Sequence, residues 1–167
     1  MKTNVRSASL ADAGAIAAVH VDAWRWAYAG LMPDGLLAGL TVDARVRQWQ
    51  QQLAEGSTTV FVAEAGGVVS GFASCGPSRD PEGLGEVYAI YLLKQVQGSG
   101  LGRELWLAAT DWLRQRGFSR VKVWVLSSNA LAREFYESAG LAPDGHAKTS
   151  QWGGTSLHEV SYSGPIS

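Results

Sequence analysis

The chain of 167 residues contains a single cysteine, Cys75. It also lacks any apolar run of the ~20 residues that cross a lipid bilayer. One cysteine excludes an internal disulfide, which fits a reducing compartment. The first residues lack the apolar segment of a secretory signal peptide, so we expect a cytoplasmic protein that is not held in a membrane.

An excess of charge is also missing. Fourteen Lys and Arg residues against fifteen Asp and Glu residues give a formal net charge of -1, which offers no basic surplus for nucleic acid or an anionic membrane. The three histidines, His20, His146 and His158, do not stand at metal-ligand spacing, so we expect no metal site. The Gly-x-Ser-x-Gly motif of serine hydrolases is absent as well.

The composition is that of an ordinary globular protein, with 46% hydrophobic and 17% charged residues. This length suits one domain with a full core, and we expect a single domain over residues 1–167. Residues 76–85 are rich in Gly, Pro and Asp, and we interpret them as a loop within that domain.

Residue periodicity predicts a mixed order of strands and helices. Residues 58–64 and 68–74 form a hairpin around Gly66 and Gly67, and residues 86–93, apolar on both faces, form a central strand. A helix at 101–116 links this strand to a strand at 121–126, so these two strands run parallel. The remaining elements are a strand at 5–8, a helix at 11–29 or two helices divided near His20, helices at 34–40, 42–54 and 129–140, and strands at 143–149 and 156–163.

The glycine-rich segment at residues 97–102 carries the strongest chemical signal. It lies between a strand and a helix, where main-chain N–H groups at the positive end of the helix dipole suit a phosphate or pyrophosphate. A Walker loop is excluded because Arg103 and Glu104, rather than a Lys-Ser/Thr pair, follow the last glycine. The dinucleotide fingerprint fails because only Leu101 separates Gly100 from Gly102. A plain structural turn remains the alternative.

The residues around this segment resemble the GNAT N-acetyltransferase superfamily. Gln97, Gly100 and Gly102 fill the family's Arg/Gln-x-x-Gly-x-Gly/Ala signature for acetyl-CoA. Residues 121–141, with Asn129 and Tyr136, are similar to its fifth strand and fourth helix. The resemblance covers nearly the whole chain, although residues 94–96 lack the proline of many members.

The resemblance implies an α/β (α+β) fold. We expect a GNAT-like, mostly antiparallel sheet of about seven strands flanked by helices. Its parallel strands at 86–93 and 121–126 splay apart to admit the pantetheine arm of acetyl-CoA, which serves as cosubstrate. The residues expected to contact the cofactor are Ile90, Tyr91, Leu92, Gln97, Gly98, Ser99, Gly100, Leu101, Gly102, Arg103 and Asn129. Asn129 is also a candidate helix cap, and Arg103 a candidate surface charge.

Two side chains are candidates for proton transfer. Glu86 begins the central strand, and two-residue alternation puts it on the same face as Tyr88, Ile90 and Leu92. We expect it to act as the base, directly or through water. The alternative is that Glu86 is a solvated residue at the end of the strand, with no role in proton transfer. The resemblance makes Tyr136 the acid that faces the coenzyme sulfur, and the alternative is a core aromatic residue.

By analogy with the family, the first helices and the last hairpin form the acceptor pocket, lined by Trp24, Tyr28, Met32 and Trp152. Seven tryptophans are many for this length, and large aromatic side chains suit an apolar or planar amine. Core packing is the alternative for each of them, and it is our interpretation for Trp49, Trp106 and Trp112.

We therefore expect an N-acetyltransferase that moves an acetyl group from acetyl-CoA to the amine of a small molecule or peptide, by direct attack in a ternary complex. The alternatives are a non-catalytic CoA-binding regulatory or sensor module and, less directly, a nucleotide-binding protein. The edge strands of the last hairpin offer a surface for a homodimer.

Overall fold

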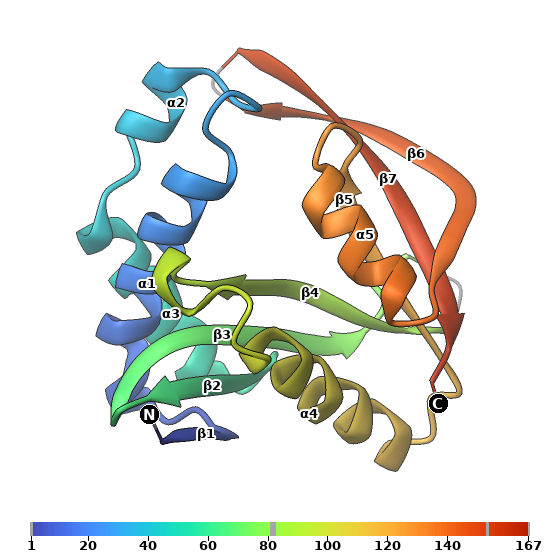
Figure 1. The fold of residues 1–167 in the computed structure, drawn as a ribbon, viewed down its shortest axis with the longest axis horizontal. Coiled ribbons are helices and arrows are strands. Elements are labelled where there is room, and N and C mark those ends of the chain that lie inside the picture. The colour runs from blue at the N-terminus through green and yellow to red at the C-terminus, as the bar shows by residue number, and fades with distance from the viewer. Residues whose placement is uncertain (1, 81–82, 153, 167) are drawn as a thin grey trace.

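The computed structural model describes residues 2–80, 83–152 and 154–166. Within these ranges the strands form one seven-stranded mixed sheet in the order β1-β2-β3-β4-β5-β7-β6 (Figure 1). The strands are β1 (Thr3–Ser7), β2 (Thr59–Ala65), β3 (Val68–Pro77), β4 (Gly85–Leu92), β5 (Arg120–Leu126), β6 (Ala142–Trp152) and β7 (Thr155–Pro165). The helices are α1 (Ala13–Ala27), α2 (Asp34–Ala38), α3 (Val42–Glu55), α4 (Leu101–Gln115) and α5 (Ala130–Ser138), with short 3-10 turns at Leu10–Asp12 and Lys94–Val96.

Local capping residues set several helix ends. The Thr41 side chain accepts a hydrogen bond from the main chain at the start of α3, and Gly56 ends that helix with a φ of 66°. Asn129 caps α5 in the same way as Thr41. The division of the first helix near His20 is wrong, because α1 continues through that residue. No proline or glycine interrupts its buried stripe there, so helical hydrogen bonding carries on.

The parallel neighbours β4 and β5 are in register only at Gly85–Val121 and Glu86–Lys122. β4 nevertheless continues to Leu92. Each strand keeps its other neighbour, β3 or β7, along its length. Figure 1 shows the two halves of the sheet diverging beyond this short contact. The expected splay is therefore confirmed, and it leaves main-chain hydrogen-bonding groups of both strands facing a gap.

Helices cover both faces of the first half of the sheet. Ile16 of α1 and Trp49 of α3 pack with Phe72 on one face of β2 and β3. Leu101 and Leu105 of α4 pack on the opposite face. The interpretation of Trp49 and Trp106 as core residues is confirmed, since each is only 5% exposed, and the half-buried Trp112 packs against the same core as Trp106.

A β-bulge interrupts β4 at Tyr88. Ser74 of β3 pairs with Ala89, whereas the next residue, Cys75, pairs with Val87, so Tyr88 has no partner on β3. One extra residue reverses the side-chain alternation beyond it. Val87 and Ile90 consequently pack against the same cluster on the α4 side although they are three residues apart.

Because of the bulge, the prediction that Glu86 shares a face with Ile90 and Leu92 is wrong, and only its part for Tyr88 is confirmed. Ile90 and Leu92 pack toward α4, while Glu86 alternates with Val87 and faces the other side of the sheet. Tyr88 shares that side. A Cβ on Gly76 would lie 2.6 Å from the Tyr88 hydroxyl oxygen, so the ring needs a glycine beneath it.

One edge of the sheet is formed by β6. It is long and largely exposed, and the homodimer through this edge stays a prediction. In the ranges that the structure describes, no helix combines the length and apolar character needed to cross a bilayer.

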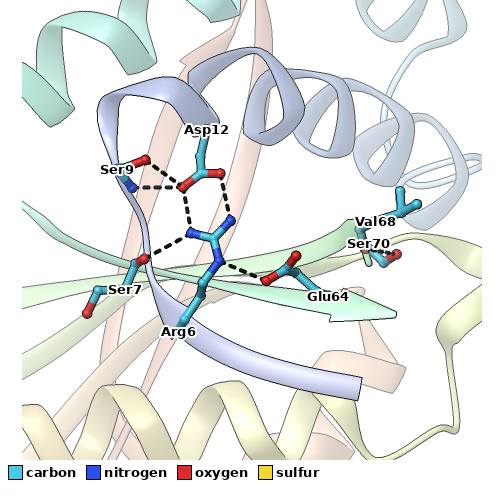
Figure 2. Close-up of polar contacts among 7 residues, drawn as sticks. All are labelled: Arg6, Ser7, Ser9, Asp12, Glu64, Val68 and Ser70. Atoms are coloured by element: carbon cyan, nitrogen blue, oxygen red, sulfur yellow. Dashed lines mark hydrogen bonds and ion pairs between the residues drawn. The ribbon is translucent and has the colours of Figure 1, made fainter. Parts of the chain in front are cut away.

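Arg6 ties the start of α1 to the sheet. Its Nη1 and Nη2 each lie 2.9 Å from a carboxylate oxygen of Asp12, and its Nε lies 2.8 Å from Glu64 on β2 (Figure 2). Asp12 also accepts the main-chain N–H of Ser9 at 2.8 Å. The hydrogen bonds from Arg6 lower the pKa of Asp12 from 3.8 to about 2.

We predict that Asp12→Asn lowers the free energy of unfolding by about 1–2 kcal/mol at pH 7, because a bidentate ion pair and a helix-start contact are lost. The folded-state pKa of Asp12 is depressed, so its contribution is complete above pH 3.8 and is lost as the pH falls through about 2. Urea unfolding at several pH values measures both effects. The exposed Asp22 of α1 supplies the control variant Asp22→Asn, and an equal loss in both variants would contradict the assignment.

Candidate active site

The gap between β4 and β5 opens a cavity of about 520 Å³ with walls from both faces of the sheet. One part, the loop half, lies beside residues 97–102 and α5 and includes Ile90 and Phe135. The other part, the aromatic half, lies beside α1 and the β6–β7 hairpin and includes Trp24 and Trp152. The splay therefore connects a glycine-rich loop on one side of the sheet with an aromatic pocket on the other.

The glycine-rich loop offers main-chain donors to the loop half. Gly98 and Gly100 have φ values of 74° and 90°, in the left-handed region that favours glycine. The first N–H groups of α4 have no intrahelical acceptor and lie at the positive end of its dipole. Gln97 and Gly102 line the cavity. The other predicted loop residues lie outside its lining: Gly98, Ser99, Gly100, Leu101 and Arg103.

Main-chain groups of Ile90 and Leu92 face the gap. The Leu93 N–H donates to the carbonyl of Ser70 on β3 at 2.9 Å, and main-chain groups of successive residues point to opposite neighbours. Ile90 and Leu92 therefore direct their groups toward β5, where pairing has ended, and the Leu92 carbonyl accepts the indole N–H of Trp26 at 3.3 Å. The main chain of Tyr91 points toward β3, and the Tyr91 residue lines the cavity through its side chain.

Asn129 and Tyr136 both line the cavity. The Asn129 side chain accepts the main-chain N–H of Ala132 at 3.2 Å, so it caps α5 at the cavity wall. Trp106 and Phe135 hold the Tyr136 ring, with ring centroids 5.7 and 5.5 Å away. Burial, assisted by Tyr91, raises the pKa of the Tyr136 hydroxyl, which keeps its proton at neutral pH.

The four residues predicted for the acceptor pocket come together in the aromatic half. Trp24, Tyr28, Met32 and Trp152 all line it. The Trp24 ring lies 5.0 Å from that of Tyr28 and 5.3 Å from that of Trp152, centroid to centroid. The Tyr28 and Tyr91 hydroxyls lie 3.1 Å apart. The pocket wall is thus aromatic, with a pair of phenol groups within it.

Glu86 does not line the cavity. Its side chain is fully buried, and its carboxylate accepts hydrogen bonds from Nη2 of Arg79 at 2.7 Å and from the Arg79 main-chain N–H at 3.1 Å. Arg79 does line the cavity. The guanidinium group therefore lies between Glu86 and the cavity, and the role of Glu86 as base stays a prediction.

Glu159 of β7 lines the aromatic half and was missed from the sequence. Its carboxylate accepts a hydrogen bond from Ser150 on the neighbouring strand at 2.8 Å. Burial raises the pKa of the Tyr28 and Tyr91 hydroxyls, and the negative charge of Glu159 adds to this effect. A carboxylate in an ordinary strand pattern gives no local signal, so only the fold reveals its position.

His20 also lines the cavity but is a weak proton acceptor. Its Nδ1 accepts a hydrogen bond from Trp49 at 3.1 Å. Burial, with a smaller contribution from Arg45, lowers the pKa of His20 to about 4. A group that resists protonation to this extent is poorly suited to take a proton from an ammonium ion.

Cys75 of β3 is buried against α4. Its side chain is fully covered, and burial raises the pKa of the thiol to about 12. The described part of the chain contains no group of three or more His, Cys, Asp or Glu side chains arranged to hold a metal ion.

This architecture recurs among known proteins. The Acetyltransferase (GNAT) family matches residues 21–141. An uncharacterized N-acetyltransferase of Bacillus subtilis, YuaI, is 44% identical over 128 residues, which are 75% of this chain and 72% of that protein. The chain therefore belongs to the GNAT family and is an acetyltransferase of that family.

Solved structures share the fold. A GCN5-related N-acetyltransferase from Rhodopseudomonas palustris gives a TM-score of 0.79 at 20% identity, covering 99% of this chain and 97% of that one. The yncA protein of Salmonella typhimurium, a putative acetyltransferase solved with acetyl-CoA, gives a TM-score of 0.72 at 24% identity, covering 100% and 95%. At these identities the likeness establishes the fold alone.

Proposed function

We propose that this chain is an N-acetyltransferase that moves the acetyl group of acetyl-CoA to the amine of a small molecule or peptide, by direct attack in a ternary complex. The observation that carries this proposal is the cavity through the splayed strands. It joins the main-chain donors of the loop half to the aromatic half, with Tyr136 in its lining. Two substrates entering from opposite faces of the sheet would meet there.

The residues of the loop half fit a CoA thioester. The N–H groups of residues 97–102 would hold the diphosphate, because glycines there leave the main chain accessible and the helix dipole favours an anion. The main-chain groups of Ile90 and the N–H of Leu92, which face the gap, would bond the pantetheine amides and the acetyl carbonyl. Asn129 would contact the pantetheine arm at the cavity wall.

Acetyl-CoA would supply the acetyl group as a thioester, whose C–S bond breaks as the C–N bond to the amine forms. Tyr136 would donate its proton to the departing sulfur, a role that its raised pKa supports by keeping it protonated beforehand. Main-chain N–H groups in the gap would stabilise charge on the carbonyl oxygen.

We assign the base to Glu159 in preference to Glu86. Both are carboxylates on the side of the sheet opposite α4, but Glu159 lines the cavity and Glu86 is enclosed behind Arg79. Glu159 would take the proton that the attacking amine loses and pass it to solvent. Glu86 would act on the amine only through water and past the Arg79 side chain.

We predict that Gly100→Ala weakens CoA binding at least tenfold by calorimetry. Open space surrounds the Cβ position of Gly100, so the new methyl group would stand where the diphosphate approaches. Gly117, at the other end of α4, is a matched control because its φ of 93° nearly equals the 90° of Gly100. Gly117→Ala should lose similar stability and keep its CoA affinity. Equal affinity losses would contradict the loop assignment.

We predict that Tyr136→Phe lowers kcat by about 10²–10⁴-fold, the usual contribution of a general acid, while CoA affinity stays within about twofold. The phenyl ring preserves packing with Trp106, so the loss isolates the hydroxyl. The rate of CoA release from acetyl-CoA, measured with an amine that the wild type acetylates, gives kcat. An unchanged kcat would contradict the role of Tyr136 as the acid. Absence of wild-type turnover would instead favour the alternative of a CoA-binding sensor module.

We predict that Glu159→Gln, which removes the group that accepts the amine proton, lowers kcat/KM at neutral pH about 10²-fold or more. The rate should partly recover at high pH, because more of the amine is then already deprotonated. Glu86→Gln serves as the comparison and should change kcat/KM less, without that recovery. The opposite ranking would return the role of base to Glu86.

A further inference from the structure

We propose that the acetyl acceptor is an α-amino acid with a large apolar side chain, its carboxylate held by Arg79 and Lys148. This inference rests on the proposed function and specifies the substrate class of the same site. It is carried by the arrangement of charge in the aromatic half, where cationic side chains stand at one end and apolar side chains at the other.

The cationic end is built where β4 and β5 are still paired. Glu86 and Lys122 are direct neighbours across the two strands, and both side chains are buried. Each binds one of two consecutive loop residues: Glu86 binds Arg79 at 2.7 Å, and Lys122 binds Asp80 at 3.0 Å. The loop is therefore fixed to the closed end of the gap by two ion pairs.

Arg79 presents its positive charge toward the cavity. Its side chain is 64% exposed, whereas the Glu86 side chain behind it is fully buried. Its guanidinium carbon lies 4.7 Å from the centre of the Tyr88 ring, which adds a cation–π contact. Nη2 donates to Glu86, which leaves the N–H groups of Nη1, on a planar group that Glu86 fixes, to donate to a substrate carboxylate.

Lys148 of β6 supplies the second cation. Its Nζ lies 4.2 Å from the centre of the Trp124 ring. The Trp124 indole N–H donates to Asp80 at 3.1 Å, which fixes the ring. The hydrogen bond from Lys122 lowers the pKa of Asp80, and the charge of Lys148 contributes further. Among the described residues no carboxylate lies at ion-pair distance from Lys148. Glu159, its partner on β7, accepts a hydrogen bond from Ser150.

The apolar end lies two residues further along β5. Leu126 packs there with Trp24, Met32 and Leu157, and Trp152 closes the group. Two residues of a strand span roughly 7 Å. The distance along β5 from Trp124 at the cationic end to Leu126 at the apolar end is therefore about the length of one amino acid.

Glu159 lies between these ends. It is the cross-strand partner of Leu126 on β5 and of Lys148 on β6. An α-ammonium group near Glu159 would therefore have its carboxylate on the Lys148 side and its side chain on the Leu126 side. Three groups on one tetrahedral carbon would meet three matching surfaces.

The same charges disfavour basic acceptors. Arg45, Arg79 and Lys148 line the cavity against one carboxylate, Glu159. Polyamines, aminoglycosides and lysine side chains carry further positive charge into this field, where like charges repel. Arg45 is the other cationic residue that could bind the substrate carboxylate. Its guanidinium carbon, however, lies 5.8 Å from the centre of the Trp24 ring, at the apolar end.

The test is an acceptor panel with acetyl-CoA and detection of released CoA. Phenylalanine, methionine and tryptophan should exceed phenylalaninamide, phenethylamine, alanine and spermidine at least tenfold in kcat/KM. Phenylalaninamide is the matched control because it differs from phenylalanine only at the carboxylate. Equal or better rates with the amide or the polyamine would overturn the proposal.

Variants then locate the carboxylate. Lys148→Gln should lower the ratio of kcat/KM for phenylalanine over phenylalaninamide at least fivefold, chiefly through KM. Arg79→Gln leaves a buried Glu86 charge unpaired and is prone to unfold, so the double variant Arg79→Gln, Glu86→Gln is made alongside it and should lower the same ratio. Arg47→Gln, an exposed change of equal charge on α3, should leave the ratio unchanged. A lower ratio in Arg45→Gln alone would overturn the assignment to Arg79 and Lys148.

The outcomes separate this inference from the proposed function. CoA binding with turnover of amines that lack a carboxylate would overturn the acceptor class and keep the acetyltransferase. CoA binding with no turnover of any panel amine would also overturn the acceptor class. Absence of CoA binding by calorimetry would overturn the proposed function itself.

Discussion

The early end of pairing between β4 and β5 is the constraint on which the rest of the site depends. A parallel pair in the middle of a sheet normally continues along its length, and ending it leaves main-chain donors and acceptors without partners. Here the pairing ends after Glu86–Lys122, and the bulge at Tyr88 follows two residues later on β4. Because a bulge bends and twists its strand, it helps to turn β4 away from β5. The open groups are then available to a ligand.

Two charged side chains are buried at the closed end of the gap, which is electrostatically unfavourable. Burying a charge is costly unless a partner and further hydrogen bonds compensate for it, and Glu86 and Lys122 are both buried on adjacent strands. Each is paired with a residue of the loop that follows β3. Such pairs contribute little net stability, but they fix the positions of Arg79 and Trp124 within the cavity wall. A rigid wall reduces the ordering cost of binding.

Local patterns predicted the elements that local physics determines. The glycine-rich turn at the start of α4 and the Asn129 cap both follow from neighbours within a few residues. The orientation of Glu86 could not be predicted, because a single unpaired residue, Tyr88, reversed the alternation. Arg79, Lys148 and Glu159 were missed because their positions in the cavity wall arise from segments distant in sequence. Lys148 reaches Trp124, and Glu159 faces Leu126, only after β5, β7 and β6 have assembled.

The burial of Cys75 has a practical consequence for the chemistry of this fold. Thiols react with electrophiles and disulfide reagents as thiolates, and a thiol whose pKa is raised to about 12 in a fully covered position holds its proton. The folded chain thus brings no competing sulfur nucleophile to a reaction whose by-product is itself a thiol. The fast signal of a chromogenic disulfide reagent would therefore come from that by-product, and a slow reaction of Cys75 would measure how often the β3–α4 layer opens.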